Sequence, residues 1–238
     1  MKLAIMESRT FVIGDIHGAY RALMQCLEKV AFDYKKDKLI CLGDVCDGWP
    51  EVSKAIDELL KIENLVYILG NHDDWALKWF ETGDVPDIWF SQGGNVTINS
   101  YNKGIPSTHI RLLQSAKLYY VTENKVFTHG GFHPETDLEK QEKETFIWDR
   151  TLLKAALQNQ YNRNETHLTK YNEVYIGHTP TLNYGNTKPV KIGEIIMMDT
   201  GAGWPGGVLT VMDIHTKQYF SSDRVDELYP GFAGRRGK

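Results

Sequence analysis

Three short apolar runs of this chain each end in a glycine followed by side chains that can bind a metal. Residues 10–13 precede Gly14-Asp15-Ile16-His17-Gly18, residues 38–42 precede Gly43-Asp44, and residues 65–69 precede Gly70-Asn71-His72-Asp73. Such runs predict buried parallel strands, and the carboxyl ends of parallel strands meet at the edge where open α/β sheets build their sites. The spacing is regular, with 26 residues between His17 and Asp44 and 26 between Asp44 and Asn71. This is about one strand-helix-strand step, so we expect the side chains to converge.

Two later segments, His129-Gly130-Gly131 and Gly177-His178-Thr179, add further ligand types. Asp15 and His17 point to the same side of an extended segment and can grip one ion. Asp44 has two carboxylate oxygens and can bridge two cations about 3.5–4 Å apart. Asn71, His129 and His178 then complete the second ion. Mixed oxygen and imidazole ligands suit Mn²⁺, Fe or Zn²⁺ and are poor for Ca²⁺. We expect two divalent ions and take Mn²⁺ as the first candidate.

Each segment alone has an ordinary structural alternative. An Asp-x-His or Gly-Asn-His segment is commonly a turn, because asparagine and glycine favour turns chemically. Cys41 and Cys46 flank Asp44 and could be soft metal ligands, although a cysteine in a strand usually serves packing. The prediction of a metal centre therefore depends on the conjunction of the segments, each placed after an apolar run.

The spacing of apolar residues predicts a parallel amino-terminal sheet followed by a second sheet. We expect helices over residues 18–30, 50–61, 71–83, 106–117 and 145–160, and an inserted, partly irregular lid or wall over residues 84–105. We expect strands of the second sheet at residues 119–121, 125–128, 173–176, 194–198, 208–212 and 218–221.

Length and composition favour one globular domain. The chain has 238 residues, of which 42% are hydrophobic and 24% charged, enough for one sizeable core. We expect a single domain over residues 1–230 and a flexible basic tail over residues 231–238. The alternative for this tail is an arm that contacts phosphate.

Charge and cysteine usage limit the partners. A net charge of −4 and a pI near 6.1 argue against a dedicated nucleic-acid binder. Three cysteines, an odd and sparse count, fit reduced thiols in a cytosol. The sequence has no apolar run near the ~20 residues of a membrane span. We expect a cytoplasmic protein that does not bind a membrane.

The five glycine-flanked segments resemble the signature blocks of the calcineurin-like metallophosphoesterases, in the phosphoprotein-phosphatase branch. Residues 146–150, 177–180 and 198–202 resemble in particular the short bacterial and bacteriophage serine/threonine phosphatases, a group close to the symmetrical diadenosine tetraphosphatases. The resemblance covers about residues 10–213. It implies an α/β fold, a β-sandwich of two mixed sheets flanked by helices.

The resemblance also implies roles for individual residues. It assigns Asp15, His17 and Asp44 to one metal, and Asp44, Asn71, His129 and His178 to the other. It implies that His72 is the general acid, held by Asp47 through its other ring nitrogen. Arg150 corresponds to an arginine that clamps phosphate, and its planar fork suits that geometry. The alternatives are a solvent-facing His72 at a helix start and an exposed Arg150.

Two positions depart from the family pattern. The second block normally continues Asp-Arg-Gly, with an arginine that grips phosphate, whereas here Asp47 is followed by Gly48 and Trp49. Asp73 stands where the protein phosphatases usually have glutamate. Trp49 could offer an aromatic face to a ligand with a ring, such as a nucleotide.

The expected activity is hydrolysis of phosphoric monoesters. The substrate would be a phosphoserine or phosphothreonine protein or a small phosphoester, attacked by a metal-activated water with His72 as acid. The alternatives are a nucleotide polyphosphate hydrolase such as a diadenosine tetraphosphatase, and a metal-binding protein without turnover.

Overall fold

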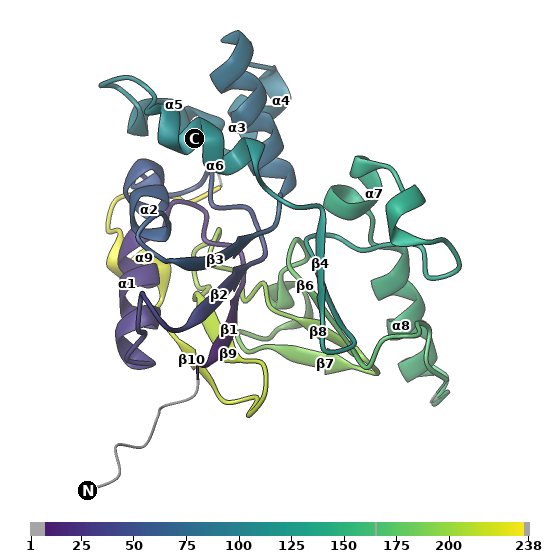
Figure 1. Ribbon diagram of the computed structural model, residues 1–238. Helices are drawn as coiled ribbons and strands as arrows, with labels where there is room; N and C mark the ends of the chain where they lie inside the picture. Colours follow the sequence, from purple (N-terminus) through teal and green to yellow (C-terminus); the bar gives the residue numbers. More distant parts are fainter. Residues whose placement is uncertain (1–7, 165, 236–238) are drawn as a thin grey trace, which may run out of the picture.

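Two mixed five-stranded sheets form the centre of the protein (Figure 1). The computed structural model describes residues 8–164 and 166–235. The first sheet has the order β10 (Tyr219–Ser221), β9 (Thr210–Asp213), β1 (Thr10–Ile13), β2 (Lys38–Cys41), β3 (Asn64–Tyr67). The second has the order β4 (Tyr119–Thr122), β5 (Lys125–Thr128), β6 (Glu173–Ile176), β8 (Ile195–Met197), β7 (Val190–Ile192).

The strands that carry the candidate ligands run parallel within each sheet. β1, β2 and β3 are parallel, and so are β5, β6 and β8. In the register, Ile13 lies opposite Cys41 and Thr128 lies opposite Ile176, so these strands end level with one another. The loops that follow them therefore leave from one edge of each sheet.

Apolar side chains from both sheets pack into one inner layer. This cluster contains Val12, Ile40, Phe127, Tyr175, Ile196 and Met212, with further neighbours. The rings of Phe127 and Tyr175 stack with centroids 4.7 Å apart. Burial of this layer fixes how the two sheets face each other.

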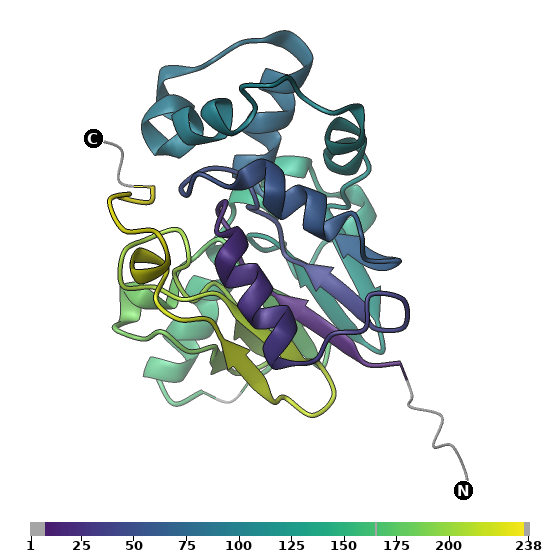
Figure 2. The ribbon, with the colours of Figure 1, turned by 90° about the vertical axis from the view of Figure 1, so that its left-hand side faces the viewer.

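Helices cover the outer faces of the sheets (Figures 1 and 2). The first sheet is covered by α1 (Tyr20–Lys29), α2 (Val52–Leu59) and α9 (Val225–Leu228), and the second by α7 (Lys143–Trp148) and α8 (Thr151–Tyr161). A group above the first sheet contains α3 (Asn71–Thr82), α4 (Asp87–Trp89), a π-helical turn (Phe90–Gly94), α5 (Asn95–Ser100) and α6 (Ser107–Gln114). Short 3₁₀ turns occur at Leu138–Lys140 and Thr181–Tyr184.

The predicted sandwich is confirmed, and two finer predictions are wrong. β9 and β10 do not join the second sheet: β9 pairs antiparallel with β1, so the first sheet is mixed. The single helix predicted over residues 145–160 breaks at Asp149, whose ψ of 142° is extended, and gives α7 and α8. Residues 84–105, predicted to be partly irregular, are helical over residues 87–100 and irregular at both ends. Among the described residues, no helix has the length and apolarity that crossing a bilayer requires.

Candidate metal centre

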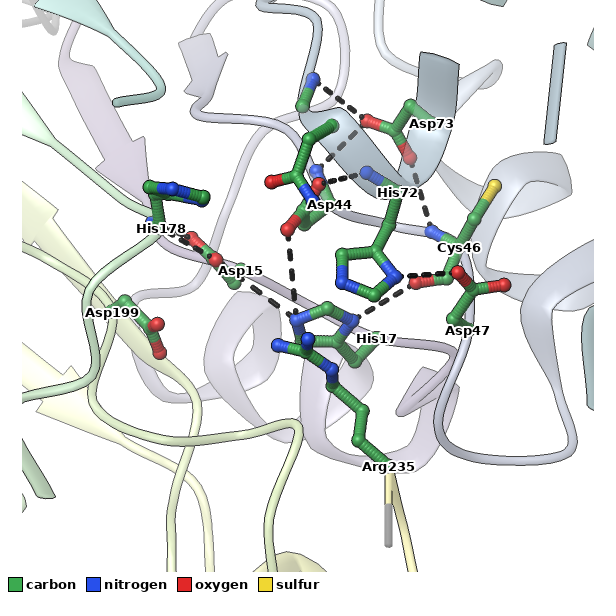
Figure 3. Close-up of polar contacts among 12 residues, drawn as sticks. Asp15, His17, Asp44, Cys46, Asp47, His72, Asp73, His178, Asp199 and Arg235 are labelled. Atoms are coloured by element: carbon green, nitrogen blue, oxygen red, sulfur yellow. Dashed lines mark hydrogen bonds and ion pairs between the residues drawn. The ribbon is translucent and has the colours of Figure 1, made fainter. Parts of the chain in front are cut away.

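The first group of candidate ligands comes from the loops after β1 and β2. Asp15, His17 and Asp44 are buried and lie close enough to hold one ion (Figure 3). The Nε2 atom of His17 lies 4.0 Å from Asp15 Oδ2 and 3.8 Å from Asp44 Oδ2. His17 Nδ1 lies 2.9 Å from the carbonyl oxygen of Cys46 and donates to it. Nε2 therefore carries the lone pair and faces the two carboxylates.

The second group shares Asp44 and takes two histidines from the other sheet. Asp44, His129 and His178 form it, and all three are buried. His129 Nε2 lies 3.2 Å from Asp44 Oδ2 and 3.1 Å from Asn71 Oδ1. The other ring nitrogen of His129 donates to the carbonyl of Leu42 at 2.7 Å. All six ligands predicted from the sequence thus converge on one place.

Two unpartnered nitrogen atoms test whether a metal fits. The Nε2 atoms of His17 and His178 are buried, and neither has a hydrogen-bond partner among the described residues. Leaving a buried polar atom unpaired costs about 1–3 kcal/mol. A divalent cation would give each lone pair a partner, and the carboxylates beside them would neutralise its charge. The donor set therefore fits two ions that share Asp44.

The backbone is strained where these ligands are held. His17, Asp44, Asp47 and His178 have φ values of 49°, 50°, 71° and 66°. Positive φ is uncommon for residues other than glycine and clusters at functional sites. Gly70 permits a close approach at the same place, because a Cβ there would lie 2.1 Å from Asp44 Oδ1. The loops thus adopt strained backbone conformations that position the candidate ligands.

Burial and neighbouring charges shift the pKa values of these groups, toward the form that binds a metal for His17, His178 and Asp44 and away from it for Asp15 and His129. Burial lowers the pKa of His17 well below its usual range and that of His178 to about 2, so both rings are neutral. Burial opposes ionisation of Asp44, but the nearby His129 and His72 hold its pKa well below the usual value. Burial and the nearby Asp199 raise the pKa of Asp15. The positive charge of a bound cation would lower the pKa of Asp15 again.

His72 is placed beside the ligands without joining either group. Its Nδ1 lies 2.5 Å from Asp47 Oδ2, and its backbone amide donates to Asp44 Oδ1 at 2.9 Å. Asp47 also accepts hydrogen bonds from Trp89 Nε1 at 2.8 Å and from the Thr97 hydroxyl at 2.6 Å. Asp47 is thus fixed on both oxygens and orients the His72 ring.

A pocket of about 280 Å³ opens over the ligands. Its lining includes His72, Trp75, Trp148, Arg150, His178 and Arg235. Arg150 is half-buried at the break between α7 and α8, and its Nε donates to the Thr179 hydroxyl at 3.1 Å. The break that the sequence did not predict thus turns Arg150 into the pocket.

Trp49 does not offer the aromatic face suggested by the sequence. Its side chain is fully buried, its Nε1 donates to the carbonyl of Ala202 at 2.6 Å, and its ring stacks on Tyr229 with centroids 5.3 Å apart. The three cysteines are buried and free, and none belongs to either candidate ligand group.

Two residues near the site received no role from the sequence, and a third, Arg235, lies in the tail for which an arm that contacts phosphate was the alternative. Asp199 follows β8 and is buried, with a pKa raised to about 6 by burial. The apolar run before it was a signal of the same kind as those that marked Asp15 and Asp44. Asp73 accepts hydrogen bonds from the amides of Asp44, Val45 and Cys46 at 2.8–3.1 Å. Arg235 reaches the site from the carboxyl-terminal segment (Figure 3).

Comparisons with known proteins agree with this geometry. The family model for calcineurin-like phosphoesterases matches residues 8–196. Serine/threonine-protein phosphatase 2 of Escherichia coli is 41% identical over 85 residues, which are 36% of this chain and 38% of that protein. A symmetrical bis(5'-nucleosyl)-tetraphosphatase of Pseudomonas fluorescens is 28% identical over 163 residues, 65% of this chain and 56% of that one. The chain thus spans less than two thirds of the length of both relatives.

A solved structure is similar over nearly the whole chain. It is a protein serine/threonine phosphatase from Saccharomyces cerevisiae, with a TM-score of 0.64 at 12% identity, covering 99% of this chain and 85% of that one. At this identity the similarity supports the fold alone.

Proposed function

Because this chain belongs to the calcineurin-like phosphoesterase family, we propose that it hydrolyses phosphoric monoesters at two divalent cations. The substrate class is a phosphoserine or phosphothreonine protein or a small phosphoester. The observation that carries the proposal is the pair of ligand groups that share Asp44, with the Nε2 atoms of His17 and His178 buried and unpartnered.

The ligand residues would divide between the two ions as follows. Asp15, His17 and Asp44 hold one ion, and Asp44, Asn71, His129 and His178 hold the other. When bound, two such cations neutralise charge on a phosphoryl group and lower the pKa of a bound water. We expect Mn²⁺, with Fe or Zn²⁺ as alternatives, since carboxylate and imidazole ligands suit all three.

His72 is proposed as the general acid. Its Nδ1 is held by Asp47 at 2.5 Å, and the ring lines the pocket beside the ligands. A ring in this position can give a proton to the leaving oxygen, which is typically worth 10²–10⁴-fold in rate. Arg150 is proposed to bind phosphoryl oxygens, because its guanidinium lines the same pocket.

A nucleotide polyphosphate is the second candidate substrate. Trp148 is 38% exposed and lies against Trp75 with ring centroids 5.1 Å apart. Both rings line the pocket, where a nucleobase could stack on them. One relative is named as a symmetrical bis(5'-nucleosyl)-tetraphosphatase, which is consistent with this alternative.

A substrate panel tests the proposal. Metal-stripped protein is reloaded with Mn²⁺, Fe²⁺ or Zn²⁺ and assayed on p-nitrophenyl phosphate, its bis-ester, a phosphopeptide and diadenosine tetraphosphate. We expect monoester hydrolysis that depends on added metal, with two equivalents bound at saturation. Preference for diadenosine tetraphosphate would favour the second candidate. No hydrolysis of any of the four compounds at two bound equivalents would overturn both.

We propose that the protein acts in the cytoplasm. All three cysteines are free and buried, and unpaired thiols are typical of a reducing compartment.

A further inference from the structure

Arg235 enters the pocket from the far end of the chain and is fixed there by three contacts. Its backbone amide donates to the carbonyl of Gly203 at 2.9 Å. Its Nη2 donates to Gln92 Oε1 at 3.1 Å, and its guanidinium carbon lies 4.9 Å from the ring centroid of Trp204. These contacts bring together the carboxyl-terminal segment, the helical group above the first sheet and the loop before β9.

The charge of Arg235 has no carboxylate partner among the described residues. The other contacts of its guanidinium are to a neutral amide and an aromatic ring. Its Nε is buried and has no hydrogen-bond partner within residues 8–164 and 166–235. By contrast, Arg224 on the surface pairs with Asp226 at 2.8 Å. A guanidinium without a direct carboxylate contact and with a free donor, in a pocket above candidate metal ligands, favours an anion.

Two glycines leave room for the stem of this arginine. A Cβ at Gly48 would lie 3.3 Å from Arg235 Cγ, and a Cβ at Gly203 would lie 2.8 Å from Arg235 Cδ. Gly48 has a φ of 96°, a conformation that residues with side chains rarely adopt. The side chain that approaches the site at this point therefore comes from residue 235 and not from residue 48.

We propose that Arg235 is a substrate-binding residue that holds the phosphoryl oxygens together with Arg150. This inference rests on the proposed function and adds a residue to it. Arg150 and Arg235 line the same pocket as His72 and His178. Two guanidinium groups there supply several N–H donors to one phosphoryl group, as the forked geometry of arginine allows. Burial and the nearby charge of Arg235 lower the pKa of Arg150, and the mutual repulsion of the two guanidinium groups is relieved when a dianion binds between them.

The test uses phosphate binding as well as turnover. Arg235→Ala, Arg235→Lys and the surface control Arg224→Ala are made in the full chain and loaded with Mn²⁺. Calorimetry measures the dissociation constant of inorganic phosphate, and kinetics on p-nitrophenyl phosphate measure KM and kcat. Metal content and the thermal midpoint are measured for each variant.

We expect Arg235→Ala to weaken phosphate binding and raise KM about tenfold, as for a lost charge-assisted hydrogen bond, with metal content unchanged. Arg235→Lys keeps the charge without the fork and should be intermediate. Arg224→Ala should match the wild type.

Phosphate affinity and KM equal to those of the wild type in Arg235→Ala would overturn the inference. Loss of bound metal in that variant would also overturn it, because Arg235 would then support the metal centre. A wild type that binds phosphate but hydrolyses no ester would overturn the proposed function, while the calorimetry would still decide the role of Arg235.

Discussion

The two ligand groups are built in different ways. Asp15, His17 and Asp44 all come from loops of the first sheet, so one sheet can assemble that group alone. The other group adds His129 and His178, which follow β5 and β6 of the second sheet, to the same Asp44. The second group therefore requires the two sheets to pack face to face, and Asp44 is the residue common to both groups.

The histidines of the second sheet are also held by atoms of the first. His129 Nδ1 donates to the carbonyl of Leu42, and the amide of His178 donates to Asp15 Oδ2 at 3.1 Å. Residues that orient metal ligands matter nearly as much as the ligands. The first sheet thus orients His129, and the hydrogen bond between Asp15 and the His178 amide holds candidate ligands of both groups at once.

The largest expected effect tests the shared residue. Asp44→Asn removes a charge that both ions would share, so we expect turnover to be lost and affinity at both sites to fall. Elemental analysis and a metal titration measure the number of ions bound. His17→Asn and His178→Asn serve as matched controls, each expected to weaken mainly one site. A variant of Asp44 that keeps one full equivalent of tightly bound metal would contradict the shared role.

The next effect concerns His72, which lies at the start of α3 after β3 and belongs to neither group. His72→Asn should lower kcat by roughly 10²–10⁴ while metal content stays the same, because the proposed role of the ring is to protonate the leaving oxygen. The loss should be smaller for p-nitrophenyl phosphate than for an alkyl phosphate, since a good leaving group needs little protonation. Asp47→Asn should act in the same direction, because it removes the carboxylate that holds His72 Nδ1. Equal losses on both esters would exclude the acid role.

Much of this arrangement could be predicted from the sequence. The apolar runs before Asp15, Asp44 and Asn71 specify strands locally, and the family assignment from the glycine-flanked segments is confirmed by the match over residues 8–196. β9 was assigned to the wrong sheet because strand pairing depends on where a distant segment packs, and periodicity does not report this.

Contacts between residues far apart in the chain likewise leave no local sequence pattern from which they could be predicted. The approach of Arg235 to Gly48 joins positions far apart in the chain, and the burial of Trp49 depends on its stacking against Tyr229. The break at Asp149 was missed because the apolar spacing continues through it from α7 into α8. Such features are set by tertiary packing, which overrides local propensity.

A smaller effect should follow from loosening the Asp44 loop. The Asp73 carboxylate accepts hydrogen bonds from the amides of Asp44, Val45 and Cys46 and from the Tyr67 hydroxyl at 3.0 Å. In Asp73→Asn the NH₂ group cannot accept, so buried donors lose their partner. We expect metal affinity to fall roughly 10–100-fold, the usual cost of removing a residue that orients a ligand.

A titration with Mn²⁺ measures this loss, and Tyr67→Phe is the control. That variant removes one of the same hydrogen bonds and should cost about 1 kcal/mol of stability with little change in metal affinity. If Asp73→Asn lowers the thermal midpoint and leaves metal affinity intact, Asp73 supports the fold and not the site.

The smallest effect is expected at the opposite edge of the first sheet, away from the ligands. Asp37, just before β2, accepts hydrogen bonds from the backbone amide and Nε of Arg9, both at 3.2 Å, and Arg9 lies just before β1. Burial would raise the pKa of Asp37, but the Arg9 hydrogen bonds lower it below 3.8. Its contribution to stability is therefore complete above the ordinary pKa and is lost as the pH falls through the lowered one.

We expect Asp37→Asn to reduce the free energy of unfolding by about 1–2 kcal/mol at pH 7, with unchanged metal content and kcat. Urea denaturation of metal-free wild type and variant from pH 7 down to pH 2 measures the difference, which should shrink below about pH 3.8. A difference independent of pH would show that packing and not the ion pair accounts for it, and a fall in metal content would show that the two edges of the sheet are coupled.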